Sequence, residues 1–202
     1  MEDSDEWFLD RKDKHRTIIR EMTGMKKAAQ KMRKNRLSLI GATSSFRFCV
    51  EELLSLESKE KQMVNSGEEQ TREALKKSSH FHTSMVELHS YQGEADKLVI
   101  WFCEDQIKLV RRANEALQMR RRRLRQLWNM KIKKVVEEDS DKEVTLAEEE
   151  FEALSLTLRT ELEHLDRMVS EDLRRTMTDH RVRSLVALAN VEKQNLYLKY
   201  TN

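Results

Sequence analysis

The chain has 202 residues and a formal net charge of +2, with 37% charged and 38% hydrophobic residues. It contains no proline and only four glycines, although average usage of about 5% would give roughly ten prolines. Because these residues punctuate loops, their scarcity excludes a fold with many turns. The apolar content is too high for a disordered chain of this charge if it is arranged periodically. The composition therefore predicts an elongated, soluble, all-α protein.

Charge is distributed in blocks along the chain. Residues 11–36 carry eleven Lys or Arg against two acids, and residues 108–134 carry eleven against the single acid Glu115. Residues 137–152 reverse the sign, with nine acids against Lys142. Such blocks create strong local potentials even in a nearly neutral molecule.

The first predicted helix, residues 5–62, has Ser4 or Asp5 as a candidate cap and carries an apolar column at a spacing of seven. This column consists of Ile18, Met25, Met32, Leu39, Phe46 and Leu53. The alternate column is mixed and consists of His15, Met22, Ala29, Arg36, Thr43 and Val50. The unbroken column predicts a coiled-coil contact, and we expect its residues Ile18, Met25, Met32, Leu39 and Phe46 to form a dimerisation seam.

Two polar segments separate the remaining helices. The sequence VNSG at 64–67 and the acidic EEDSDKE at 137–143 are predicted turns. Apolar residues at three-four spacing then predict helices over about 68–136 and 144–200, with a break near Gly93 left open. The three helices are expected to form one domain over residues 1–202.

Helices of this length bury an apolar stripe only against partners of similar length, so three of them in one chain leave a stripe uncovered. We therefore expect an antiparallel three-helix protomer that pairs with a second chain as an elongated two-fold dimer. Homodimer and heterodimer both stay open. The polar seam residues His15, Arg36 and Gln106 are candidates for specifying the partner.

Catalytic and metal-binding patterns are not found in the sequence. His80 and His82 are two residues apart and so do not form the i, i+4 pair of a helical metal site. Cys103 has no histidine at helical spacing, and it and Cys49 are expected to be buried thiols in a reducing compartment. No P-loop, nucleophile elbow or dinucleotide fingerprint occurs. We expect no enzyme activity, no catalytic or metal-binding residue and no cofactor.

The segment QMRRRRLRQLWNMKIKK, residues 118–134, holds eight bases and no acid. At about 100° per residue, Arg120–Arg123 span most of the helix circumference, and their i±4 neighbours include no acid. Three interpretations stay open at this point. The arginines could pair with acids on a neighbouring helix such as Glu148–Glu150, grip nucleic acid, or contact an anionic membrane.

Three segments carry a family resemblance. DSDEWFLDRK near the start, EALQMRRRRLRQLW late in the second helix and FEALSLTLRTELEHLDRM in the third resemble the BAR domain of the sorting nexins, in particular the retromer-associated subgroup. The resemblance spans nearly the whole chain in the same order. It implies a crescent-shaped dimer of antiparallel three-helix protomers that senses or imposes curvature on endosomal membranes.

The resemblance also implies a site and partners. In that family, basic residues near the distal end of the second helix touch lipid, and the matching positions here are Arg120, Arg121, Arg122, Arg123, Arg125, Lys131, Lys133 and Lys134. The implied partners are an anionic or phosphoinositide-containing membrane, a second copy or another sorting nexin, and retromer. The implied location is cytoplasmic, peripheral on endosomal membranes.

The chain departs from the family pattern in one respect. Only six residues precede Trp7, so the phosphoinositide-binding PX domain that normally comes before the BAR region is not in this sequence. Phosphoinositide specificity is therefore not expected of this chain. The acidic block 137–152 also opposes lipid affinity unless it turns away from the membrane. The alternative function is a coiled-coil interaction scaffold or heterodimerisation partner without lipid binding; no nucleic-acid partner is expected.

The N-terminus MEDSDEWF is acidic and is not expected to act as a signal peptide. No apolar run approaches the length of a membrane span. Any contact with a membrane is therefore expected from the cytosolic side and outside the lipid core.

Overall fold

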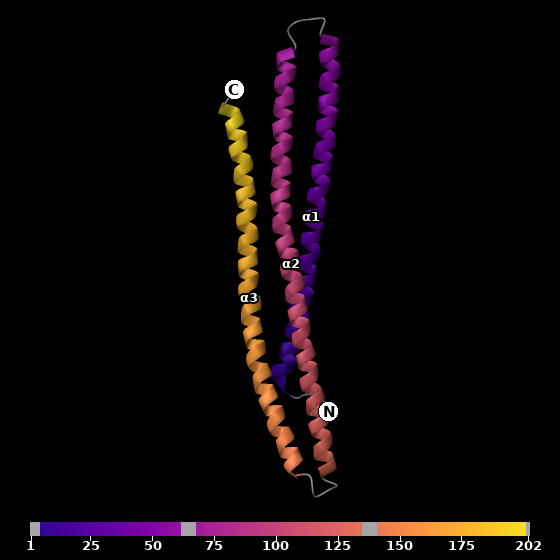
Figure 1. The fold of residues 1–202 in the computed structure, drawn as a ribbon, viewed down its shortest axis with the longest axis vertical. Coiled ribbons are helices and arrows are strands. Elements are labelled where there is room, and N and C mark those ends of the chain that lie inside the picture. Colours follow the sequence, from indigo (N-terminus) through magenta and orange to yellow (C-terminus); the bar gives the residue numbers. More distant parts are fainter. Residues whose placement is uncertain (1–4, 62–67, 135–140, 201–202) are drawn as a thin grey trace. The chain divides into compact units, whose positions relative to one another are not determined.

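The computed structural model describes residues 5–61, 68–134 and 141–200, and the side chains of 5–56, 72–133 and 142–193. It contains three α-helices (Figure 1): α1 (Glu6–Lys61), α2 (Glu68–Lys134) and α3 (Asp141–Tyr200). No strand occurs in the described ranges, so the all-α prediction is confirmed. The helix α2 continues through Gly93 without a break, and α3 begins three residues earlier than predicted. The predicted turn at 64–67 and most of the one at 137–143 lie outside the described residues.

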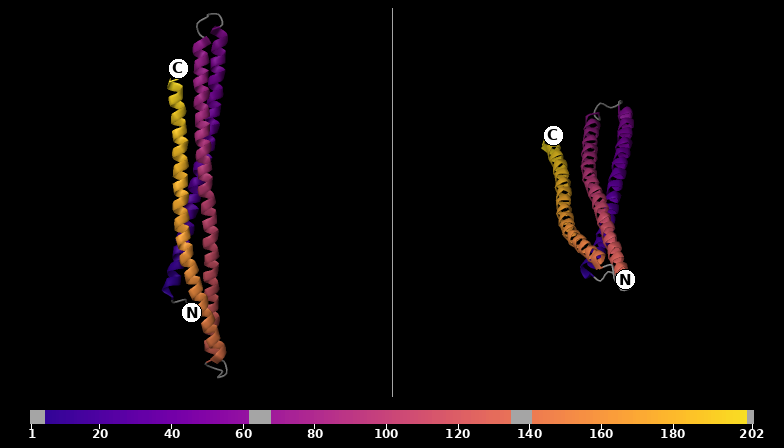
Figure 2. Two further views of the ribbon diagram at one scale, coloured as in Figure 1. Left: turned by 60° about the vertical axis from the view of Figure 1, so that its left-hand side comes forward. Right: turned by 60° about the horizontal axis from the view of Figure 1, so that its bottom comes forward.

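The chain divides into two compact units, and each contains a segment of all three helices. The first unit comprises Met1–Lys26 and Trp101–Arg175, and the second comprises Lys27–Ile100 and Thr176–Asn202. Within each unit α2 lies alongside α1 and α3 with the opposite chain direction (Figures 1 and 2). The expected single domain stays a prediction.

The start of α1 is fixed by Asp5, one of the two predicted caps. Its carboxylate Oδ1 accepts a hydrogen bond from the backbone N–H of Trp7 at 3.2 Å. Its backbone carbonyl accepts from the N–H of Phe8 at 3.1 Å. These bonds satisfy a donor that a helix N-terminus otherwise leaves unpaired, and the carboxylate complements the helix dipole.

The core of the first unit forms where columns at a spacing of seven face one another. On α1 the buried column is Phe8, His15 and Met22. On α2 the buried columns consist of Cys103 and Val110, and of Gln106, Ala113, Arg120 and Leu127. Phe8 and Ala113 pack with Leu162 of α3, which is 2% exposed. In the first unit the mixed column of α1 therefore faces the core, and the unbroken apolar column lies outside it.

His15, a polar member of these columns, forms a hydrogen bond to a neighbouring helix. In the first unit, His15 Nδ1 donates a hydrogen bond to Asn114 Oδ1 at 2.9 Å, and His15 is 0% exposed. Its Nε2 is buried and has no hydrogen-bond partner among the described residues. Burial lowers the pKa of His15, an effect that the Asn114 hydrogen bond opposes and the nearby cations Arg11 and Lys14 reinforce.

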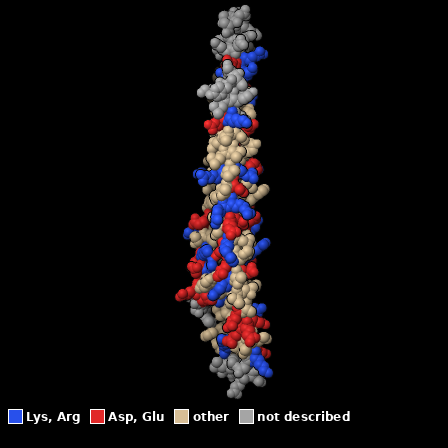
Figure 3. Space-filling model, turned by 90° about the vertical axis from the view of Figure 1, so that its left-hand side faces the viewer, with Lys and Arg blue, Asp and Glu red and all other residues tan. Residues whose placement is uncertain are grey.

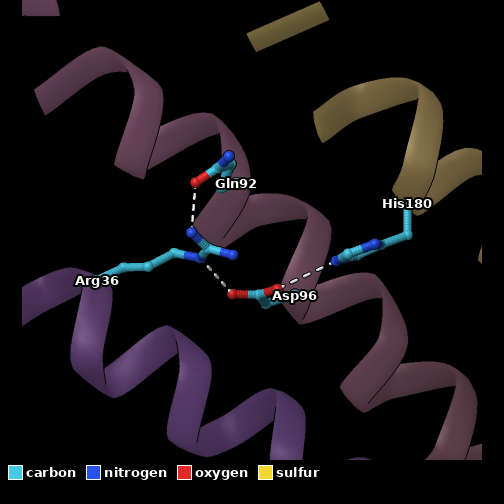
Figure 4. Close-up of polar contacts among 4 residues, drawn as sticks. All are labelled: Arg36, Gln92, Asp96 and His180. Atoms are coloured by element: carbon cyan, nitrogen blue, oxygen red, sulfur yellow. Dashed lines mark hydrogen bonds and ion pairs between the residues drawn. The ribbon is translucent and has the colours of Figure 1, made fainter. Parts of the chain in front are cut away.

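In the second unit, Asp96 joins all three helices (Figure 4). Its Oδ2 accepts from Arg36 Nε of α1 at 2.9 Å, and its Oδ1 accepts from His180 Nε2 of α3 at 3.2 Å. Arg36 also donates to Gln92. Because Asp96 is 1% exposed, an unpaired carboxylate there would be strongly unfavourable. The contact therefore selects one register of α1 and α3 against α2 in this unit, as a polar seam residue does in a coiled coil.

The cysteine prediction is half right. Cys103 is 0% exposed, and burial raises the pKa of its thiol. Cys49 is exposed. It adjoins Val50 of the half-buried mixed column and thus lies beside the inward-facing stripe.

The low pKa of His15 predicts a pH-dependent stability. In the unfolded chain His15 has the ordinary histidine pKa of about 6.5, whereas burial disfavours its protonation in the folded chain. The free energy of unfolding therefore falls as the pH drops through and below about 6.5. We expect His15→Gln, measured by urea unfolding at pH 7.5 and 5.5, to lose less stability on acidification than the unaltered chain. His80→Gln, at an exposed position, should lose as much as the unaltered chain. Equal losses for the unaltered chain and His15→Gln would contradict the assignment.

Candidate anion-binding surface

The basic segment 118–134 forms the last part of α2 and belongs to the first unit. Its side chains point in all directions around the helix, so they meet different environments. Arg120 continues the column of Ala113 and Leu127 and points into the core, while most of its neighbours point to solvent. The segment is therefore divided into an interior part and a surface part.

Arg120 is 4% exposed and lies between aromatic rings. Its guanidinium carbon is 3.6 Å from the ring centroid of Phe8 and 5.0 Å from that of Phe151. Its Nε donates to Ser155 Oγ at 3.1 Å, and Nη2 lies 3.4 Å from Asp5 Oδ2. A guanidinium is planar and weakly hydrated, so it can stack and donate in its plane at once. The charge of Arg120 is therefore enclosed by the protein in this structure, so the lipid contact of Arg120 gains no support from its position and stays a prediction.

The same cluster anchors the start of α1 to α3. Arg159 stacks over Trp7 at 4.9 Å and lies 3.5 Å from Asp5. Arg11 stacks on Trp7 at 4.7 Å and pairs with Asp166 of α3. Trp7 and Phe8 of α1, together with the capping carboxylate of Asp5, are thus contacted by arginines from all three helices.

The surface part of the basic segment contains Arg121, Arg122, Arg123, Arg125 and Lys133. The last four are exposed, and Arg121 is half-buried. Arg123 donates to the neutral amide of Gln126 at 3.4 Å. Within the described part of the chain, no acid forms an ion pair with any of these five residues. They leave a surface of uncompensated positive charge on α2.

Lys131 and Lys134 differ from this group. Lys131 forms an ion pair with Glu148 of α3, one of the acids that the pairing interpretation named as partners for the arginines. Both side chains are partly exposed, so the pair contributes at most about 1 kcal/mol. The side chain of Lys134 lies outside the described residues.

Two basic residues of α1 that were not among the predicted site residues lie near Arg121. Lys12 and Arg16, one helical turn apart, line a cavity together with Arg121. The sequence shows the excess of bases over 11–36 but not which of them face α2. The spacing of four from buried Phe8 to Lys12 and on to Arg16 was the available signal, since such residues share one helix face.

A different charge pattern covers the face drawn in Figure 3, the side on which α3 lies in Figure 1. Acidic and basic side chains are interspersed on this face among neutral ones. Mixed charges of this kind largely cancel beyond the Debye length of about 8 Å at physiological ionic strength. The one-signed surface on α2 is therefore the stronger candidate for recognising a large anionic partner.

The predicted dimerisation residues lie outside the protomer core. Ile18 and Met25 are half-buried in the first unit. In the second unit Met32, Leu39 and Phe46 are 43%, 46% and 66% exposed. Two of the three polar residues considered as partner-specifying, His15 and Arg36, are instead bonded within the protomer. The third, Gln106, is buried there.

Comparison with protein-family models, curated proteins and solved structures finds no match to this chain. The resemblance to the sorting nexins therefore stays a prediction. None of the described helices combines the length and the apolar character that crossing a membrane requires. The described residues also hold no group of three His, Cys, Asp or Glu side chains arranged to bind a metal ion.

Proposed function

We propose that the chain is a dimeric module that binds anionic endosomal membrane and senses or remodels its curvature during protein sorting. The observation that supports membrane binding best is the surface of unpaired basic side chains on α2, in particular Arg122, Arg123 and Arg125. The curvature and the endosomal location rest on the resemblance of three sequence segments to the BAR domain of the sorting nexins.

The electrostatic term of this surface has the size of a weak, reversible contribution to membrane binding. A Lys or Arg near an anionic leaflet contributes about 1 kcal/mol. Arg122, Arg123, Arg125 and Lys133 would together contribute about 4 kcal/mol per chain by this rule. A dimer whose two chains both face the membrane would double the number of contacts, which raises the avidity without any new kind of contact.

The exposed apolar column of α1 supports dimerisation. Met32, Leu39, Phe46 and Leu53 lie at a spacing of seven and are each more than two-fifths exposed. A recurring exposed apolar stripe on a long helix is typical of a surface that another helix covers. A second copy of the chain carries the same stripe, so a two-fold contact can cover both.

A coiled-coil scaffold without lipid binding is the second candidate. It is favoured by the same α1 column, which would then serve a different helical partner. The two candidates differ in the role of the basic surface on α2, since a scaffold does not require it.

Dimerisation predicts the mass of the purified chain in solution. Sedimentation equilibrium should give twice the 24.1 kDa of one chain. The pair Leu39→Glu and Phe46→Glu should give the single-chain mass, because each places a charge in the proposed contact. The matched pair Leu156→Glu and Leu188→Glu, at exposed positions of α3, should keep the double mass. A mass of one chain for the unaltered protein at all concentrations would contradict the proposed dimer.

Membrane binding predicts a charge-dependent affinity for vesicles. Replacing Arg122, Arg123 and Arg125 together by Glu should weaken binding to phosphatidylserine vesicles by at least about 100-fold, since three contacts of about 1 kcal/mol are lost. Co-sedimentation at 0.15 M and 0.5 M salt measures this, and the higher salt should also weaken the unaltered chain.

The control for this experiment reverses three charges elsewhere. Lys76, Arg181 and Arg183 are exposed residues of the second unit, and their replacement by Glu changes the net charge equally. This variant should keep most of the vesicle affinity. Equal loss in both variants would mean that net charge alone decides binding. No binding by the unaltered chain would favour the scaffold.

A further inference from the structure

A small cavity opens between α1 and α2 in the first unit, beside the basic surface. Its volume is about 220 Å³, and Phe8, Leu9 and Leu117 supply apolar lining. Three cationic residues also line it: Lys12, Arg16 and Arg121. None of the described residues that line it is acidic. The cavity thus combines an apolar wall with a concentrated positive charge.

The cations of this cavity are scarcely neutralised by the protein. Neither Lys12 nor Arg121 has an ion-pair partner in the described part of the chain. Arg16 pairs with Asp13 at 3.0 Å, but both side chains are largely exposed, so this contact contributes little and is easily exchanged. Arg121 Nε is buried and has no hydrogen-bond acceptor among the described residues. An anion that entered the cavity would therefore find unused donors.

The donor set matches a phosphate group. A guanidinium presents parallel N–H groups that fit two phosphate oxygens, and a lysine ammonium adds a compact charge. Asn114 also lines the cavity. Its amide oxygen is occupied by His15, which leaves its NH₂ group as a further donor. The apolar wall offers contact to carbon atoms next to the phosphate.

The size of the cavity limits the ligand. Pockets that enclose drug-sized molecules have volumes of about 300–1,000 Å³, and this cavity is smaller. It has room for a headgroup and adjoining carbons rather than for a nucleotide or a folded peptide.

We propose that this cavity binds the phosphate of an anionic membrane phospholipid, with the adjoining glycerol carbons against Phe8, Leu9 and Leu117. The source of the ligand rests on the membrane function proposed above. Free phosphate shares the charged chemistry but has no carbon atoms for the apolar wall. Phosphatidylcholine has the carbon atoms, but its headgroup has no net charge.

Calorimetric titration of the full chain with soluble short-chain lipids tests the proposal. Dihexanoyl phosphatidic acid, kept below its micelle concentration, should bind at least tenfold more tightly than inorganic phosphate or dihexanoyl phosphatidylcholine. The pair Lys12→Gln and Arg121→Gln should weaken this binding at least tenfold. The pair Arg181→Gln and Arg183→Gln, exposed in the second unit, should leave it unchanged.

A variant that fills the cavity separates a pocket from general surface charge. Gln118→Trp places a large side chain at a lining position and keeps every cation. It should abolish binding of the short-chain phosphatidic acid while the thermal unfolding curve stays the same. Binding that survives Gln118→Trp, or that is insensitive to Lys12→Gln with Arg121→Gln, would overturn the proposal. Inorganic phosphate that binds as tightly as the ester would overturn the assignment to lipid.

The failures of this inference and of the membrane function are distinguishable. If vesicles bind through Arg122, Arg123 and Arg125 but the soluble lipid does not bind, the cavity assignment is wrong and the membrane function stands. If the soluble lipid binds and vesicles do not, the phosphate site stands, and the membrane as source of its ligand is wrong.

Discussion

The first unit is organised around the enclosed guanidinium of Arg120. It stacks on Phe8 of α1 and Phe151 of α3, and it bonds to the carboxylate that caps α1 and to the hydroxyl of Ser155. One side chain of α2 therefore holds both neighbouring helices. A buried charge is tolerated only when its donors are satisfied, so the start of α1 and the beginning of α3 must converge on it. This requirement also fixes which faces of α2 turn outward, and with them the basic residues that remain available to a partner.

Much of the fold follows from the sequence. The absence of proline and the long three-four apolar patterns predict three helices, and α1 and α2 end within two residues of the predicted positions. The inward face of α1 was harder to predict, because two columns compete. The unbroken apolar column from Ile18 to Leu53 has the stronger pattern, yet His15 and Met22 of the mixed column are buried in the first unit and Ala29 is buried in the second. The reason is pairing across helices: Asn114 accepts a hydrogen bond from His15 Nδ1, and Asp96 pairs with Arg36, and neither partner can be identified from α1 alone.

The candidate site shows the same limit of sequence reasoning. The basic segment is obvious in the sequence, and four of its eight bases are exposed without an acidic partner in the described structure. Arg120 shares the seven-residue register of Ala113 and Leu127, which was a readable sign of burial, but four consecutive arginines obscure it. Lys12 and Arg16 lie about a hundred residues from Arg121 in the chain, so only the packing of α1 on α2 brings them together. A positive column on one helix and a basic run on another thus become one surface through the fold.

In this account Arg120 stabilises the fold, whereas exposed arginines such as Arg122 are available to a partner. The most direct test compares the free energies of unfolding of Arg120→Lys and Arg122→Lys. Both substitutions keep the charge, so a residue that only attracts an anionic surface should tolerate them. Lysine cannot stack between two rings and donate in a plane as arginine does. Urea unfolding should show a loss of about 2 kcal/mol or more for Arg120→Lys and less than about 0.5 kcal/mol for Arg122→Lys. Equal stability of the two variants would contradict the enclosed position of Arg120 and would indicate that it is exposed like Arg122.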